Sequence, residues 1–442
     1  MNSFLKDIKN KVLIFDGSKG TMLQKFGLKG GDCPELWNIT HADEVKKVYS
    51  MYRDAGADVI QTNTFQGNRM KLEEYGLGER MYELNYVSVQ MAKEVMKGRG
   101  YVAASIGPLG KLFEPSGELT FEKAYEVFAE QVKAVADGGA DIINFETFTD
   151  LNELTAALLA ARDTANLPVI CSMAFEQNGR TLMGNSPETA VHVLKSRGAA
   201  MVGTNCSMGP GHLVEVVKKM HYAGGGYLCV KPNAGLPKIE NGEVVYTETP
   251  EKFALLVSEF VKYGARLIGG CCGTSPEYIK ALKGSLDKIE IPEIEEGISD
   301  MLVSSTKTLD INGICKEDIG HIDALADEEL ASCLEKGDMS IIEDMVLDMA
   351  AEGYRAIKID VDSVKKDKML LANIVRAAQG YTREPLIIKT GDVEALEEAL
   401  KIYCGRAGIL KPGLECGEDK RIEEVANKYG AVILNGVNDI IF

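Results

Sequence analysis

We predict an α/β protein in which a (β/α)8 TIM barrel is followed by a second, partial (β/α) domain of about five strands. Three observations lead to this prediction. The chain has 442 residues, which is long for a single hydrophobic core and favours two domains. One short phrase recurs four times in the first part of the chain. Apolar runs of strand length also alternate there with amphipathic helical stretches, and this alternation is typical of a parallel sheet.

The recurring phrase contains a helix end, a glycine cap, a short apolar strand and polar residues at the carboxyl end of that strand. Its four copies are Asp54–Phe65, Asp137–Phe148, Arg197–Cys206 and Tyr263–Cys272. Four more apolar runs bring the number of strands to eight: Val12–Phe15, Tyr101–Ile106, Pro168–Ala174 and Tyr227–Val230. Amphipathic helices are expected between them at Glu122–Val135, Leu151–Arg162, Pro187–Leu194 and Lys252–Val261. Eight strand–helix units match a closed barrel.

The alternative fold is an open, doubly wound sheet. Against it, the first strand is not followed by the Gly-x-Gly-x-x-Gly fingerprint of that fold. In a barrel the carboxyl ends of the strands converge on one face, and this face carries the active site. The residues at the eight strand ends are Asp16-Gly17, Asn63, Gly107-Pro108, Glu146, Met173, Asn205-Cys206, Asn233 and Cys271-Cys272.

Charge and composition exclude several classes of partner. The net charge of −17 argues against nucleic acid or an anionic membrane, because both bind basic surfaces. The sequence has no run of about 20 apolar residues and no signal peptide at its start, so we expect a cytoplasmic protein and no membrane partner. In that compartment the ten cysteines are expected to be thiols or metal ligands rather than disulfides.

The stretch Ile268–Glu277 combines an apolar strand end, three glycines, two cysteines and a helix start for which Thr274 is the expected N-cap. Cys206 stands at another strand end, so in a barrel three thiolates can converge on one ion. Thiolates select zinc, and three protein ligands leave a fourth position open. Such a site favours alkylation of a bound thiol over hydrolysis. The alternative is that these cysteines are small buried hydrophobes.

Six motifs, in order, resemble the homocysteine S-methyltransferase family, in particular its module in cobalamin-dependent methionine synthases. They are Phe15–Thr21, Gln61–Phe65, Phe145–Phe148, Thr204–Ser207, Lys231–Gly235 and the GGCCG stretch at 269–273. The resemblance covers residues 1–285. It implies zinc on Cys206, Cys271 and Cys272, with the homocysteine thiolate as fourth ligand. It also implies that Asp16 and Glu146 bind the amino group, with Gly17 and Asn63 nearby and Asn233 close to the metal.

The two acids also suit this role by their chemistry, because an α-amino group needs carboxylate acceptors. Asp16 and Glu146 are the only acids at the expected strand ends of the barrel. Each has a structural alternative: Glu146 as a surface acid that caps the next helix near Asp150, and Asp16 as a cap of a turn with Gly17. We interpret Cys33, Cys171 and Cys229 as structural, because they fall in a loop or inside strands.

Residues 286–300 are acidic, contain proline and glycine, and are expected to be a linker. Residues 301–442 then resume the strand–helix alternation. Their five expected strands are Lys307–Ile311, Ala356–Asp360, Pro385–Ile388, Gly408–Leu410 and Ala431–Leu434. Their expected helices are Met339–Ala351, Lys368–Ala378, Val393–Tyr403 and Lys420–Lys428.

This region is similar to the first part of a pterin-binding barrel. The likeness lies in Lys336–Asp338, Ile359–Asp362, Ile387–Asp392 and Leu434–Asn438. Asp362, Lys389 and Lys411 depart from the pterin-binding pattern, and about three strand–helix units are missing. We therefore expect no folate binding. We expect the open edges of the sheet to be covered by the first domain or by a homodimer; the alternative is a solvated, degenerate remnant of a barrel.

The methyl donor is not defined by these motifs. The sequence has no Asp-x-His-x-x-Gly cobalamin-binding stretch, so a separate methyl-corrinoid protein is the first choice by resemblance. A small donor such as S-methylmethionine or betaine is the second. Homocysteine is the expected acceptor, with another thiol as the alternative. A rival hypothesis is a non-catalytic zinc- or thiol-binding scaffold for a corrinoid partner.

Overall fold

The computed structural model describes residues 2–114, 116–240, 243–287, 289–364, 367–411 and 418–434. The chain divides into two compact units. The first comprises Met1–Met183 and Ala199–Gly297, and the second comprises Gly184–Gly198 and Ile298–Phe442. Among the described residues, no helix combines the length and the apolar character that crossing a bilayer requires.

The first unit contains the predicted barrel. Its eight parallel strands have the order β1-β10-β7-β6-β5-β4-β3-β2, and a bridge between Phe15 and Val59 joins the two ends of this order. This arrangement confirms the (β/α)8 prediction. The strands are β1 (Leu13–Ile14), β2 (Val59–Gln61), β3 (Tyr101–Ile106), β4 (Ile142–Phe148), β5 (Val169–Met173), β6 (Met201–Asn205), β7 (Leu228–Lys231) and β10 (Ala265–Ile268).

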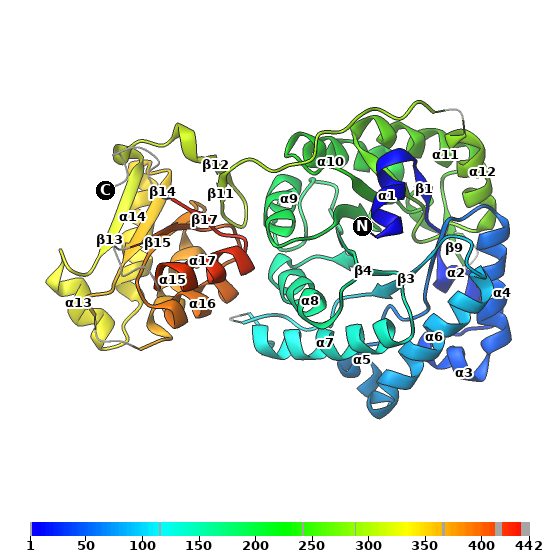
Figure 1. Cartoon of the computed structure of the whole chain (residues 1–442), viewed down its shortest axis with the longest axis horizontal. Helices are drawn as coiled ribbons and strands as arrows, with labels where there is room; N and C mark the ends of the chain where they lie inside the picture. Colours follow the sequence, from blue (N-terminus) through cyan, green and yellow to red (C-terminus); the bar gives the residue numbers. More distant parts are fainter. Residues whose placement is uncertain are drawn as a thin grey trace. The chain divides into compact units, whose positions relative to one another are not determined.

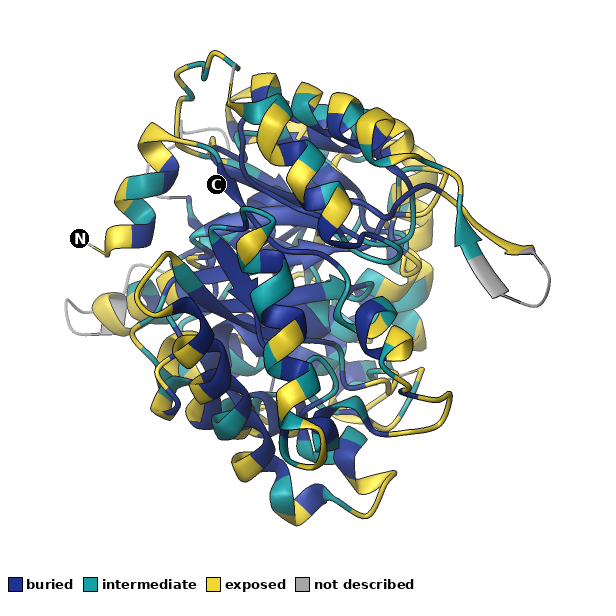
Figure 2. Cartoon of the chain, turned by 90° about the vertical axis from the view of Figure 1, so that its right-hand side faces the viewer, coloured by how far each residue is buried: buried dark blue, intermediate teal, exposed yellow. Residues whose placement is uncertain are grey.

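Helices follow these strands and surround them (Figure 1). Figure 2 shows the strands buried and the helices exposing one face, as expected for amphipathic sequences. Side-chain caps start several helices; Asp150, for example, accepts the N–H of Asn152 at the start of α8. The helices of this unit are α1 (Ser3–Asn10), α2 (Lys19–Lys25), α3 (Trp37–Thr40), α4 (Ala42–Asp54), α5 (Arg69–Glu73), α6 (Met81–Met96), α7 (Phe121–Asp137), α8 (Leu151–Thr164), α10 (Pro210–Tyr222), α11 (Pro250–Ser258) and α12 (Pro276–Leu286).

The amino-terminal helix α1 closes the end of the barrel at which the strands begin. Phe4 and Ile8 are buried in one cluster with residues from the strands of the barrel, among them Leu13 and Leu267. The ring of Phe4 also meets the ring of Tyr101 edge to face, with 5.5 Å between centroids. With this end packed by apolar side chains, the opposite end is left for polar chemistry.

A hairpin that we did not predict lies between β7 and α11. It consists of β8 (Pro237–Glu240) and β9 (Glu243–Tyr246), which pair antiparallel. Its strands are short and rich in charged residues, so they carry little of the apolar alternation by which strands are recognised.

The second unit contains a five-stranded parallel sheet of order β13-β14-β15-β16-β17, which confirms the predicted number of strands. The strands are β13 (Ile319–Asp323), β14 (Ala356–Asp360), β15 (Leu386–Lys389), β16 (Gly408–Leu410) and β17 (Val432–Ile433). The helices are α9 (Pro187–Ser196), α13 (Glu328–Glu335), α14 (Ser340–Glu352), α15 (Leu370–Tyr381), α16 (Val393–Ile402) and α17 (Glu418–Lys428).

The prediction that the first strand of this sheet is Lys307–Ile311 is wrong. Residues Thr308–Asp310 form β12, which pairs antiparallel with β11 (Met301–Val303) outside the five-stranded sheet. The first strand of the sheet is β13, whose sequence Ile-Gly-His-Ile-Asp includes a glycine and an exposed histidine. Because the sheet buries only part of this edge strand, its apolar signal is weak.

Candidate active site

The three cysteines predicted as metal ligands lie together at the carboxyl ends of the barrel strands. Cys206 follows β6, and Cys271 and Cys272 follow β10, with β7 between these two strands. All three Sγ atoms lie within 4.8 Å of one another, and Cys206 Sγ is 3.8 Å from Cys272 Sγ. Zinc–sulfur bonds of about 2.3 Å in a tetrahedron place sulfurs about 3.8 Å apart. The donor set therefore fits zinc in both chemistry and spacing.

The backbone around these cysteines is held in an unusual conformation. Cys206, Ser207 and Thr147 have φ values of 62°, 54° and 66°, in the left-handed region that side-chain-bearing residues seldom adopt. Asn205 links two of these strand ends, because its Oδ1 accepts the N–H of Thr147 at 2.7 Å and its Nδ2 donates to Thr147 Oγ1 at 2.8 Å. The same Nδ2 lies 3.7 Å from Cys271 Sγ. Such conformations persist where surrounding contacts hold them, and they cluster at functional sites.

Without a cation, the thiols hold their protons. A hydrogen bond with Cys271 lowers the pKa of Cys206, but a hydrogen bond with Cys272 and burial raise it, to about 11 overall. The pKa values of Cys271 and Cys272 are also raised. A bound metal ion removes such protons, because thiolates are the ligands.

A cavity of about 380 Å³ opens beside the three cysteines. Gly17 lines it, and a side chain there is excluded, since an added Cβ would come within 2.4 Å of the backbone oxygen of Thr274. The prediction that Thr274 caps α12 is wrong: Ser275 occupies the N-cap position, while Thr274 Oγ1 donates to the backbone oxygen of Cys271 at 2.6 Å. The cavity is lined by residues that include Ser18, Lys19, Glu35, Gln61, Asn63, Phe65, Ser105, Glu146, Thr147, Cys206, Cys271 and Cys272.

The two predicted acids lie at this end of the barrel, and each contacts a lysine. Asp16 is fully buried and accepts hydrogen bonds from Lys19 Nζ and from the N–H of Gln61, the latter at 2.8 Å. Burial raises the pKa of Asp16 and lowers that of Lys19, against their mutual attraction. Glu146 accepts from Ser105 Oγ and from Lys231 Nζ.

The structural alternatives considered for these acids do not hold. Asp150 caps α8, so Glu146 is not the cap of that helix. The N-cap of α2 is Ser18, whose side chain accepts the N–H of Thr21, and the hydrogen bonds of Asp16 go to Lys19 and Gln61.

The two predicted asparagines differ in position. Asn63 lines the cavity, and its Nδ2 donates to the backbone oxygen of Pro34 at 2.7 Å and to Asn38 Oδ1 at 3.0 Å. Asn233 follows β7, and its Oδ1 accepts the N–H of Cys272 at 3.1 Å. Asn233 therefore holds the backbone of one of the three clustered cysteines.

Sequence reasoning missed four side chains of the site. Asn205 stands at a recognised strand end, but its bonds to Thr147 were not foreseeable from spacing. Lys19 lies inside the motif Phe15–Thr21, and Lys231 begins the motif Lys231–Gly235. A positive charge in a motif at the end of the barrel where acids are expected could have indicated that these lysines belong to the site. Glu35 comes from a 3-10 turn (Pro34–Leu36) and has no strand-end signal; burial raises its pKa, and its Oε1 accepts the N–H of Gln66 at 2.8 Å.

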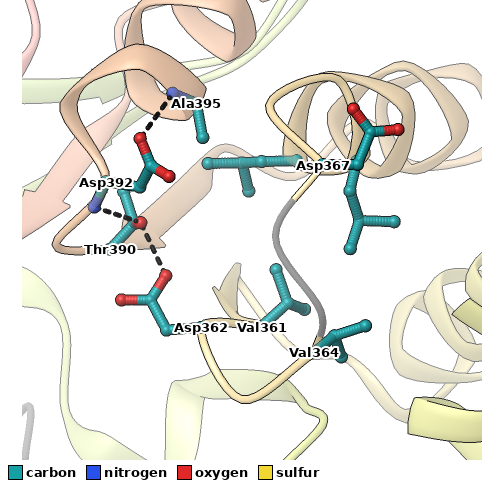
Figure 3. A pocket seen from close by; sticks show the side chains of 9 residues that line it. Val361, Asp362, Val364, Asp367, Thr390, Asp392 and Ala395 are labelled. Atoms are coloured by element: carbon teal, nitrogen blue, oxygen red, sulfur yellow. Dashed lines mark hydrogen bonds between the residues drawn. The ribbon is translucent and has the colours of Figure 1, made fainter. Parts of the chain in front are cut away.

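The second unit has a small cavity of about 30 Å³, room for about one or two water molecules. Figure 3 shows Asp362, Thr390 and Asp392 around it. Asp362 accepts from Thr390 Oγ1 at 2.6 Å and from the N–H of Gly391 at 2.8 Å, while Asp392 caps α16. Lys389 Nζ donates to Asp360 Oδ2 at 2.6 Å. These pterin-like motif residues thus bond to one another; Asn435–Asn438 of the last motif lie outside the described residues.

The barrel thus presents three clustered cysteines, a set of ligands suited to one metal ion, beside a cavity at the carboxyl ends of its strands, where barrel enzymes have their active sites. Residues 13–286 match the family model described as homocysteine S-methyltransferase. The chain belongs to this family and is a methyltransferase.

Two curated relatives are methionine synthases. That of Mycobacterium tuberculosis (strain ATCC 25618 / H37Rv) is 27% identical over 442 residues, which cover 93% of this chain and 36% of the relative. That of Mycobacterium leprae (strain TN) is 29% identical over 474 residues, covering 97% and 38%. The chain therefore spans well under half the length of these relatives.

Among solved structures, the homocysteine methyltransferase MmuM from Escherichia coli in its metallated form has the same barrel. It is 24% identical, with a TM-score of 0.54, over 64% of this chain and 98% of that chain. At this identity the likeness concerns the fold.

Proposed function

We propose that this chain is a zinc-dependent homocysteine S-methyltransferase that forms methionine. The observation that carries this proposal is the cluster of three Sγ atoms within 4.8 Å at the rim of the cavity. When bound, zinc supplies a Lewis acid that lets a thiol lose its proton at neutral pH. The reaction forms the bond between the acceptor sulfur and the methyl carbon and breaks the bond between that carbon and the donor.

The residues of the chain have separate tasks in this proposal. Cys206, Cys271 and Cys272 hold the metal, and Asn205 and Asn233 fix the strand ends that carry them. Holding the acceptor sulfur in line with the methyl donor before the reaction raises the rate by several powers of ten, because the entropy cost of aligning the two has already been met.

In this proposal the acceptor lies in the cavity, whose lining includes Glu146 and Lys19; Asp16 is buried beside the cavity and is hydrogen-bonded to Lys19. Gly17 leaves room for the acceptor, and Asn63 shapes the cavity wall. Asp16 Oδ1 is buried with no hydrogen-bond partner in the described part of the chain, which supports a contact with the amino group.

We further propose that the methyl group comes from a corrinoid protein in trans, with S-methylmethionine or betaine as the other donors to be tested. The acceptor domain comprises residues 1–285, residues 286–300 link it to residues 301–442, and this partial domain does not use folate. Its small cavity and the mutual bonding of Asp362, Thr390 and Asp392 support the last point.

The test combines zinc analysis with methyl transfer to homocysteine from methylcobalamin or from S-methylmethionine. We expect one zinc per chain and transfer from one of these donors. Cys272→Ser should lose both, whereas Cys315→Ser, at an exposed thiol of the second unit, should keep both. Zinc that remains stoichiometric in Cys206→Ser and Cys272→Ser would contradict the metal site. Zinc binding without transfer from any donor would favour the scaffold hypothesis.

A further inference from the structure

The cavity contains an ammonium group with unused hydrogen-bond donors. Lys19, in the first turn of α2, lines the cavity and its side chain is 11% exposed. An ammonium group has three N–H donors. Among the described residues, Asp16 Oδ2 accepts one hydrogen bond from Lys19 Nζ, so two donors remain. The nearest other partner is the face of the Tyr52 ring, with 5.0 Å from Nζ to the centroid.

The second lysine of the site differs in this respect. Lys231 is fully buried, and its Nζ donates both to Glu146 Oε2 and to Gln61 Oε1. The ring of Phe15 covers Nζ at 4.5 Å from the centroid. Lys231 thus uses two of its three donors and does not line the cavity, whereas Lys19 uses one and does line it.

These contacts change the charge that an acceptor meets. Asp16 and Glu146 are the two acids expected to bind an α-ammonium group, and each is already neutralised by a lysine of the chain. Two carboxyl groups remain to attract a cation. Asp16 Oδ1 is buried and has no hydrogen-bond partner among the described residues, and Glu35 lines the cavity without a lysine beside it. Burial favours the neutral form of Glu35 by raising its pKa, whereas Lys19 offers two N–H donors of a charged group to an anion in a cavity where water competes little.

We propose that Lys19 binds the carboxylate of the acceptor thiol, so that the site selects acceptors by their carboxylate more than by their ammonium group. The substrate class is therefore thiol carboxylates, of which homocysteine is one member. This proposal rests on the proposed function, from which it takes the thiol acceptor. Charge-assisted hydrogen bonds of this kind change affinity roughly 10- to 100-fold.

The test compares three thiols by calorimetry on the zinc-loaded full chain, which requires no methyl donor. They are homocysteine, 4-mercaptobutyrate, which lacks the amino group, and 3-aminopropane-1-thiol, which lacks the carboxylate. We expect 4-mercaptobutyrate to bind about as tightly as homocysteine, and the amino thiol to bind roughly 10- to 100-fold more weakly. Amino thiol binding as tight as that of 4-mercaptobutyrate, or no binding by any of the three, would overturn the proposal.

Variants at two lysines of α2 separate the effect of the Lys19 charge on binding from any effect on folding. Lys19→Met should remove the advantage of 4-mercaptobutyrate over the amino thiol, and Lys19→Arg should keep it. Lys25→Met, at an exposed position of the same helix, should change neither affinity. An unchanged preference in a folded Lys19→Met variant would also refute the role of Lys19. Absence of methyl transfer from every donor, with the carboxylate preference intact, would instead count against the proposed function alone.

Discussion

Replacing Asn205 by alanine should loosen the cysteine centre. Asn205 is fully buried and makes three contacts: two with Thr147, at 2.7 and 2.8 Å, and one with Cys271 Sγ at 3.7 Å. The change removes these contacts and leaves the N–H of Thr147 without its acceptor. With about 1 kcal/mol for each bond, the free energy of unfolding should fall by about 2–3 kcal/mol.

The same change should weaken zinc binding by about 10- to 100-fold, the usual effect of losing a residue that orients a metal ligand. Urea unfolding of the zinc-free protein measures the first effect, and competition with a chromophoric chelator measures the second. Asn144→Ala is the matched control, because Asn144 is a buried asparagine of β4 whose Nδ2 bonds Gln61 at 2.9 Å. It should lose stability without losing zinc affinity. Unfolding within about 0.5 kcal/mol of the parent together with unchanged zinc affinity in Asn205→Ala would refute the reasoning.

Three further predictions concern other parts of the first unit. Burial raises the pKa of Glu153 from its ordinary value of 4.5 to about 8. Its contribution to the free energy of unfolding is therefore complete below pH 4.5 and is lost as the pH rises through 8. Glu153→Gln should flatten this decline when urea unfolding is measured across pH, and an unchanged slope would contradict the prediction. Gly17→Ala places a Cβ 2.4 Å from the oxygen of Thr274, so it should lower the free energy of unfolding by about 1–3 kcal/mol and weaken thiol binding. The control is Gly20→Ala, whose Cβ meets no atom within 4 Å and which should be tolerated. Equal effects of the two variants in thermal unfolding would argue against the close approach at Gly17. Without a cation the pKa values of Cys206, Cys271 and Cys272 are raised, so after chelation of the metal these thiols should react with iodoacetamide at alkaline pH; equal labelling before and after chelation at that pH, measured by peptide mass spectrometry, would show that they are not ligands.

Much of the fold was predictable because parallel barrel strands are buried on both faces and therefore appear as apolar runs. Val59–Gln61, Ile142–Phe148 and Met201–Asn205 are strands whose burial leaves few polar positions. The hairpin β8–β9 and the edge strand β13 lack this signal, since their residues are charged, small or partly exposed. Periodicity alone does not separate such strands from loops.

The sequence predicted which residues lie together in the site, but it did not predict the hydrogen-bond partners of each residue. Closure of the barrel and the strand order bring the ends of β6 and β10 close together, and with them Cys206, Cys271 and Cys272. The partners of Asp16 and Glu146 depend on where two lysine side chains turn, which is decided by burial and by rings such as those of Tyr52 and Phe15. Sequence spacing carries no information about those rotamers.

The pairing of β1 has a consequence for how the chain folds during synthesis. Leu13 and Ile14 of β1 pair with Leu267 and Ile268 of β10, and the helix that closes the barrel floor precedes both. A ribosome therefore releases the first strand long before its partner exists. Contacts of such large sequence separation form slowly, because a long loop must close first. The growing chain therefore carries an unpaired edge of β1 until the eighth strand emerges, and such edges favour aggregation until they are paired.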